Sequence, residues 1–145
     1  MDLNRLEKYG DWGLLIARVG VGLMFVFVHG EPKLMGGPER WAKLGTAMEY
    51  LGIGFAPTFW GFMAAIAEFF GGLLLALGLF FRPACLGLIA TMFVAAAMHL
   101  GRGDTMVQSS HAIENFFFLI GLFLVGPGKF SLDYFLTQRR NSSSK

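Results

Sequence analysis

The chain has little charge, a single cysteine and no stretch of alternating residues typical of a β-strand. Only 15% of its 145 residues are charged, whereas a soluble domain is nearer a quarter. The lone Cys85 excludes an internal disulfide and a C-x-x-C redox pair, and with them membrane enzymes that work by thiol exchange. Cys85 lies in an apolar run, where a small buried hydrophobe is the simplest interpretation.

Large clusters of basic residues are missing as well. The net charge is only +2, and no basic run is long enough to follow a phosphate backbone, so we expect no nucleic-acid partner. No glycine-rich nucleotide loop follows a strand pattern. The first twelve residues mix acids with bases, which is a poor start for a signal peptide, and we expect the apolar run that follows to be retained as a membrane span.

Hydrophobic residues make up 54% of the chain, with 16 Phe and 20 Gly. Four apolar segments are long enough to cross a bilayer, the last of them only if it begins near Gln108. They are Trp12–Val28, Pro57–Phe81, Ala84–Leu100 and a fourth with its apolar core at Phe116–Val125. We therefore predict an all-α, transmembrane four-helix bundle. A single membrane domain would cover residues 1–136, and residues 137–145 would form a polar tail, disordered at Asn141–Lys145.

The basic residues predict the orientation. One side of the predicted bundle holds seven Lys or Arg residues and the other holds four, which favours a multi-pass protein of the cell inner membrane with both termini cytoplasmic. In the first extracytoplasmic loop, Pro38 begins a pattern in which Trp41, Leu44 and Met48 recur at helical spacing. This pattern predicts a short amphipathic helix; an irregular loop is the alternative. Gly126-Pro127-Gly128 should end the fourth span, and Ser131 should cap a short helix to Leu136.

Glu68 is the only ionisable residue between Pro57 and Phe81. A charged carboxylate facing lipid at the bilayer centre costs about 2.5–3.5 kcal/mol on insertion scales. Small residues share its helical stripe, which is typical of a helix–helix contact; they are Gly61, Ala65, Gly72 and Ala76. Glu68 should therefore point into the bundle.

Polar residues also lie on single stripes of the other three spans. The stripes are Arg18, Gly22, Phe25, His29 and Lys33; Thr91, Ala95, His99 and Arg102; and Glu114, Phe118, Gly121 and Val125, with His111 one turn earlier. If these stripes face inward, they form a polar cluster in the outer half of the bundle with Glu68 as its floor. The alternatives are local: Arg18 reaching the inner surface, Lys33 as an interface cation, His99 as a core histidine, His111 as a surface residue, and Glu68 as half of a structural pair.

This cluster has limited chemical uses. An unpaired Glu68 could carry a proton, whereas one paired with Arg18 or a charged His29 would stay ionised. No His-x-x-x-His or Glu-x-x-His pair occurs within a helix, so we predict neither haem nor a metal. A Phe-rich cavity with a few hydrogen-bonding groups suits a quinone, which is the cofactor we predict.

The pattern resembles the DoxX family of small membrane proteins. The matching segments are Arg18 and Gly22; His29-Gly30-x-x-Lys33-Leu34; Ala67-Glu68-Phe69-Phe70-Gly71-Gly72; Leu77-Gly78-Leu79-Phe80-Phe81-Arg82; His99; Glu114-Asn115; and Gly126 to Asp133. The resemblance implies a four-helix membrane bundle and a link to quinol-oxidase or thiosulfate:quinone redox chemistry. The chain lacks the extra domain of the larger sulfur-oxidising relatives, so whether it is catalytic alone, or an enzyme only as a subunit of a quinone-linked oxidoreductase, stays open.

We accordingly predict an integral inner-membrane subunit of a quinone- or sulfur-linked redox system. Glu68 would be a proton acceptor or fixed charge, and His29 and His99 would be hydrogen-bonding or relay groups. The cofactor would be bound by Arg18, acting as counter-ion, with Lys33, Glu68, His99 and Glu114. Its partners would be membrane lipid and a protein of the redox complex, with a homodimer left open. The alternatives are a non-catalytic membrane adaptor and a small transporter or metal-handling protein.

Overall fold

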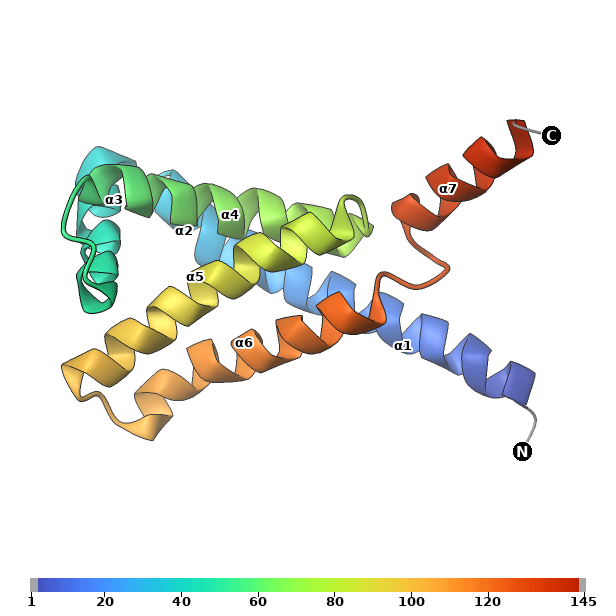
Figure 1. The fold of residues 1–145 in the computed structure, drawn as a ribbon, viewed down its shortest axis with the longest axis horizontal. Coiled ribbons are helices and arrows are strands. Elements are labelled where there is room, and N and C mark those ends of the chain that lie inside the picture. Colours follow the sequence, from blue (N-terminus) through green and yellow to red (C-terminus); the bar gives the residue numbers. More distant parts are fainter. Residues whose placement is uncertain (1–2, 144–145) are drawn as a thin grey trace.

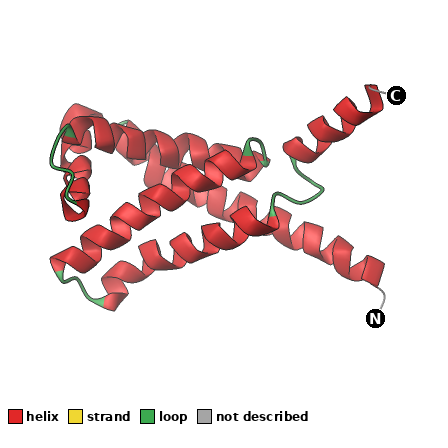
Figure 2. Ribbon diagram, viewed as in Figure 1, coloured by secondary structure: helices red, strands yellow, loops and turns green. Residues whose placement is uncertain are grey.

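In the computed structural model, which describes residues 3–143 and the side chains from Tyr9 to Ser142, every regular element is a helix (Figures 1 and 2). In chain order they are α1 (Leu3–Met24), the π-helix η1 (Phe25–Gly30), α2 (Glu31–Leu34), α3 (Gly37–Gly45), the 3₁₀ helix η2 (Thr46–Leu51), α4 (Pro57–Leu77), α5 (Phe81–Arg102), α6 (Met106–Val125) and α7 (Leu132–Ser143).

Four stretches of helix are long and apolar enough to cross a membrane, which confirms the predicted bundle. They are Tyr9–Leu34, Pro57–Leu77, Phe81–Arg102 and Met106–Val125. The second span ends earlier than predicted because Gly78 takes the left-handed conformation (φ 65°) and caps α4. Phe81 therefore begins the third span instead of ending the second.

The spans alternate in direction, so the molecule has two ends. The loop end holds α2, α3, η2 and the turn between α5 and α6, and lies at the left of Figure 1. The termini end holds the beginning of α1, the turn between α4 and α5, and α7, which points away from the spans.

Helices α1 and α4 pack through glycine. A Cβ atom added to Gly22 would lie 2.6 Å from the carbonyl oxygen of Gly72, and one added to Gly30 would lie 2.5 Å from Cα of Phe69. Both distances are too short for a real side chain, so only glycine allows the two backbones to approach this closely. The predicted contact stripe of α4 is confirmed, because Gly61, Ala65, Glu68 and Gly72 are all buried.

The π-helical segment η1 was not expected from the sequence. Its widened turn is closed by a bond from the Glu31 amide to the Val26 carbonyl, and Pro32 follows directly. Proline has no N–H to give and its ring crowds the carbonyl four residues earlier, so a wider turn before it relieves the clash. The segment changes the direction in which the side chains after it, including Lys33, leave the helix.

The first-loop helix is confirmed as α3, with Pro38 in its first turn. It packs on the beginning of α4, where the Gly61 backbone meets the carbonyl of Trp41, and the Trp41 ring lies 4.6 Å from that of Phe62. Helix η2 then reaches α5, with the Tyr50 ring against Gly101.

The apolar core joins α5 and α6 to the first two spans. Its buried residues are Phe25, Leu75, Phe81, Cys85, Leu88, Met92, Leu119 and Leu122, so Cys85 is the buried hydrophobe expected of it. Helix α6 contributes Ser109, Ala112, Leu119 and Leu122 to the interior. The prediction that its Glu114, Phe118, Gly121 and Val125 stripe faces inward is therefore wrong: that stripe is exposed, because Leu119 and Leu122, on the other side of the helix, fill the core.

The C-terminal segment fastens onto the termini end. The fourth span stops at Val125 as predicted, and Gly126 and Gly128 take positive φ values of 91° and 77°. The Ser131 hydroxyl accepts a bond from the Tyr134 amide (3.3 Å) and caps α7. The Asp133 carboxylate accepts bonds from the amides of Phe80 (3.0 Å) and Phe81 (2.9 Å), and so caps the beginning of α5.

Helix α7 is longer than predicted. It continues past Leu136 to Ser143, so the expected disorder of the tail is wrong as far as that residue, since Gln138, Arg139 and Arg140 are good helix formers. Ser144 and Lys145 lie outside the described residues.

Candidate functional site

The buried Glu68 carboxylate is paired with Lys33. Glu68 is 2% exposed, and the Lys33 ammonium lies 2.6 Å from its Oε1 and 2.5 Å from its Oε2. Both oxygens therefore share one ammonium, and apart from Lys33 the Oε2 atom has no hydrogen-bond donor among the described residues. A carboxylate has about four lone-pair sites, so the single ammonium leaves this buried group able to accept further hydrogen bonds.

Lys33 reaches Glu68 from the loop end, and its side chain is 22% exposed. The Trp41 indole donates to the Lys33 carbonyl oxygen over 2.8 Å, so α3 holds the residue that supplies the cation. From the sequence, Trp41 was expected only to be an apolar residue of an amphipathic helix. The signal available was its indole N–H, which usually finds a partner when buried.

Two histidines meet across separate helices at the same end. The rings of His29 on η1 and His111 on α6 lie 4.7 Å apart between centroids, at 41° to each other. His29 also lies 5.8 Å from the Phe25 ring, and one turn later the chain reaches Lys33. His111 is held by Asn115, whose side-chain nitrogen lies 3.3 Å from His111 Nε2 and donates to the His111 carbonyl over 2.8 Å.

His99 has a different partner. Its Nδ1 lies 2.7 Å from Oδ2 of Asp104, just beyond the end of α5. Gly103 turns the chain back with φ 75°, and this turn brings Asp104 to the histidine. Asp104 was not among the predicted site residues, although an acid directly after a helix-ending glycine was a visible signal.

Arg18 does not pair with Glu68. It is 2% exposed, and its two terminal nitrogens donate to the carbonyl of Ala76 (2.6 Å) and to the carbonyl of Phe130 (2.5 Å). Ala76 lies eight residues beyond Glu68, about 12 Å along the helix axis. The guanidinium instead binds the Ala76 carbonyl in the last turn of α4, where carbonyls lack helical partners and the helix dipole favours a cation. Its second bond, to the Phe130 carbonyl, links this helix end to the C-terminal segment.

Glu114 is exposed on α6, on the side away from the core. The structure therefore brings together Lys33 with Glu68, and His29 with His111. Arg18 lies apart from them, bound to backbone carbonyls at the end of α4. His99 is paired with Asp104, and Glu114 is exposed on α6.

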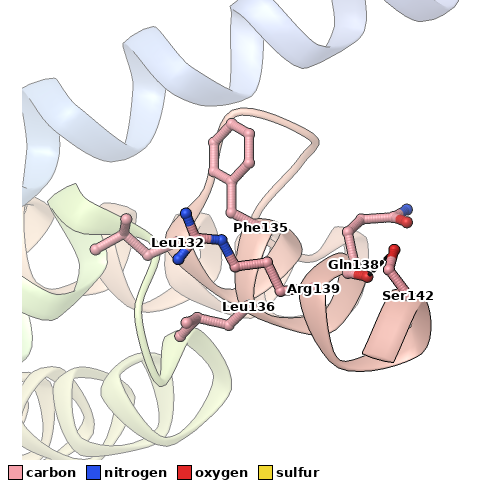
Figure 3. A pocket seen from close by; sticks show the side chains of 6 residues that line it. All are labelled: Leu132, Phe135, Leu136, Gln138, Arg139 and Ser142. Carbon is pink, nitrogen blue, oxygen red and sulfur yellow. Dashed lines mark hydrogen bonds between the residues drawn. The ribbon is translucent and has the colours of Figure 1, made fainter. Parts of the chain in front are cut away.

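Within the described part of the chain, no group of three or more His, Cys, Asp and Glu residues could hold a metal ion. A hollow of about 650 Å³ is lined by side chains of α7 alone (Figure 3). A second, of about 390 Å³, lies between α7 and the segment before it, beside Asp11. No predicted site residue lines either hollow.

The sequence matches the DoxX family over residues 13–100, which is more than half of the chain. The chain belongs to the DoxX family. No curated protein and no solved structure was found to match it. The segment matched to DoxX contains Arg18, His29, Lys33, Glu68 and His99, whereas His111 and Glu114 lie beyond it.

Proposed function

We propose that this DoxX protein is a membrane subunit of a quinone-linked redox system and holds a quinone head group at the loop end. The observation that carries the proposal is the buried Glu68 carboxylate, which meets the Lys33 ammonium and has no other hydrogen-bond donor at Oε2 among the described residues. A quinol hydroxyl is a donor of the required kind. A membrane-soluble molecule also suits a pair whose two members both lie in candidate membrane spans.

The neighbouring groups support both redox forms of such a ligand. A quinone carbonyl oxygen can accept a hydrogen bond from the Lys33 ammonium or from an imidazole. A quinol can donate to Glu68, which then serves as the acceptor for a proton released on oxidation. The pair of His29 and His111 lies at the same end and offers a second exchangeable proton. In this proposal the electrons pass to a partner subunit.

The proposal changes the roles predicted for two residues. Arg18 is held by backbone carbonyls at the termini end, so we assign it to the frame of the bundle. His99 is paired with Asp104 beside the turn between α5 and α6, so we assign it to that turn. The ligand-binding groups we propose are Lys33, Glu68 and His29.

Quinone retention tests the proposal. The protein is extracted in a mild detergent, and the quinone that stays bound is extracted with solvent and quantified per chain. We expect the wild type to retain quinone and Glu68→Gln to retain several-fold less, because the neutral amide removes the charge from the acceptor. Glu49→Gln is the matched control, an exposed acid in η2 at the same end. Quinone-free wild type, or equal retention by Glu68→Gln, would contradict the proposal.

A further inference from the structure

Glu114 lies within a membrane span and points away from the protein. It is eight residues into α6, which is about 12 Å from the beginning of the helix. The buried residues Ala112, Leu119 and Leu122 lie on the opposite side of the helix. A single copy of the chain therefore presents a carboxylate to the acyl chains, which is unfavourable when the group is charged.

The face around Glu114 has the character of a helix–helix contact. Phe118, Gly121 and Val125 continue the same stripe and are exposed. A Cβ atom added to Gly121 would meet nothing within 4 Å, so this glycine serves no contact within the chain. A glycine on an outward stripe allows a second helix to approach closely, and a polar group beside it gives that helix a hydrogen-bond partner.

The chain itself limits what can cover this face. Near this depth the exposed residues of the other spans, over the described residues, include the apolar Phe27 on η1, Met63 on α4 and Phe93 on α5. None of them offers a cation or a donor to Glu114. The nearest group that could donate a hydrogen bond to a Glu114 carboxylate is His111, which is exposed on α6 itself. It lies three residues, about 4.5 Å along the helix axis, before Glu114.

We infer that α6 is the interface through which two copies of this chain associate in the membrane, with Glu114 of each copy paired to His111 of the other. A two-fold axis parallel to the spans makes the arrangement self-complementary. The Asn115 side-chain nitrogen lies 3.3 Å from Nε2 of His111, which leaves Nδ1 as the ring nitrogen available to the second copy's carboxylate. Gly121 lies one heptad after Glu114, where the two backbones come closest. This inference shares His111 with the quinone proposal but none of the proposed ligand-binding groups Lys33, Glu68 and His29, so its tests succeed or fail separately from quinone retention.

The mass of the protein in detergent gives the first test, by light scattering of the eluting protein–detergent complex. We expect a dimer for the wild type. Glu114→Leu and Gly121→Leu should raise its dissociation constant about tenfold or more, since interhelical polar bonds and close packing each contribute on this scale. Gly20→Leu is the control, because Gly20 is also exposed in a span and has open space around it, and it should leave the dimer unchanged. Because the changed side chains lie outside the core, all three variants should remain folded, with the helix content of the wild type by circular dichroism.

Cross-linking in liposomes gives the second test, with Cys85→Ala as the background. Gly121→Cys should form a disulfide-linked dimer on oxidation, and Gly20→Cys should not. Four results would overturn the inference. They are a monomeric wild type, an unchanged dissociation constant of the dimer in Glu114→Leu, cross-linking at Gly20→Cys, and a different membrane protein bound in place of the second copy.

Discussion

At the scale of single residues, the character of the proposed site depends on which cation pairs with Glu68. The sequence predicted that Glu68 points inward, and the stripe of small residues on its own helix was enough to show this. It did not predict Lys33 as the partner. The helical pattern placed Lys33 on the same inward stripe as Arg18 and His29, but a stripe does not tell which of its members lies at the depth of Glu68, and the π-helical segment η1 before Lys33 changes that position further.

Removing the cation tests the pair. Lys33→Met leaves Glu68 buried without its partner and should lower the free energy of unfolding, by less than the about 3–5 kcal/mol of a fully buried pair, because Lys33 is 22% exposed. The double change Lys33→Met with Glu68→Leu should recover most of that loss, since no charge is then buried. Thermal unfolding in detergent measures both. Losses that simply add in the double variant would show that the two side chains do not interact.

Arg18 provides the opposite case. Arg18→Leu removes two charge-assisted bonds to the carbonyls of Ala76 and Phe130, each contributing about 1.5–3 kcal/mol, so the unfolding temperature should fall clearly. Quinone retention by the protein that remains folded should match the wild type. A folded Arg18→Leu protein that loses its quinone would return this residue to the ligand site.

At the scale of helices, the spans were predictable because apolar length, proline and glycine mark them. Pro57, Pro38 and Gly126 act where the sequence placed them. The inward face of α6 was not predictable from its polar residues. The polar Glu114 favours an inward-facing stripe in the sequence, whereas the larger apolar area of Leu119 and Leu122 determines which side of the helix is buried.

The close packing of the first span, Tyr9–Leu34, on α4 depends on glycine. Two glycines of this span allow the effect of losing a backbone contact to be compared with the effect of replacing a glycine that has no contact. Gly30→Ala would place Cβ 2.5 Å from Phe69 Cα and should destabilise the protein by about 1–3 kcal/mol, as overpacking does. Gly20→Ala meets nothing within 4 Å and should be neutral or stabilising by up to about 1 kcal/mol. Thermal unfolding in the same detergent compares them. Equal effects at the two positions would contradict the close approach of the two backbones.

At the scale of the whole molecule, the four spans place both termini at one end, and the basic residues predict that this end is cytoplasmic. The prediction is tested on whole cells with a maleimide that cannot cross the membrane, in a Cys85→Ala background. Thr46→Cys, exposed at the loop end, should be labelled, and Thr137→Cys, exposed on α7, should be labelled only after the cells are opened. The reverse pattern would invert the topology and move the proposed site to the cytoplasmic side.

The bundle followed from hydropathy, because four apolar stretches of this length have few other arrangements. The site followed only in part. Its members come from α2, η1, α4 and α6, and whether side chains from four elements meet depends on crossing angles and on the depth of each residue. Those quantities separate Arg18 and His99 from Glu68 and bring Lys33 to it.

Quinone binding at the pair of Lys33 and Glu68 is the central claim, and a fluorescence titration tests it most directly. Trp41 donates to the Lys33 carbonyl, so a quinone bound beside this residue should quench its emission. With a short-chain quinone, we predict saturable quenching in the wild type and in Glu49→Gln. Glu68→Gln should raise the dissociation constant about tenfold, the loss of one charge-assisted hydrogen bond. Quenching that never saturates, or an unchanged constant in Glu68→Gln, would contradict the account.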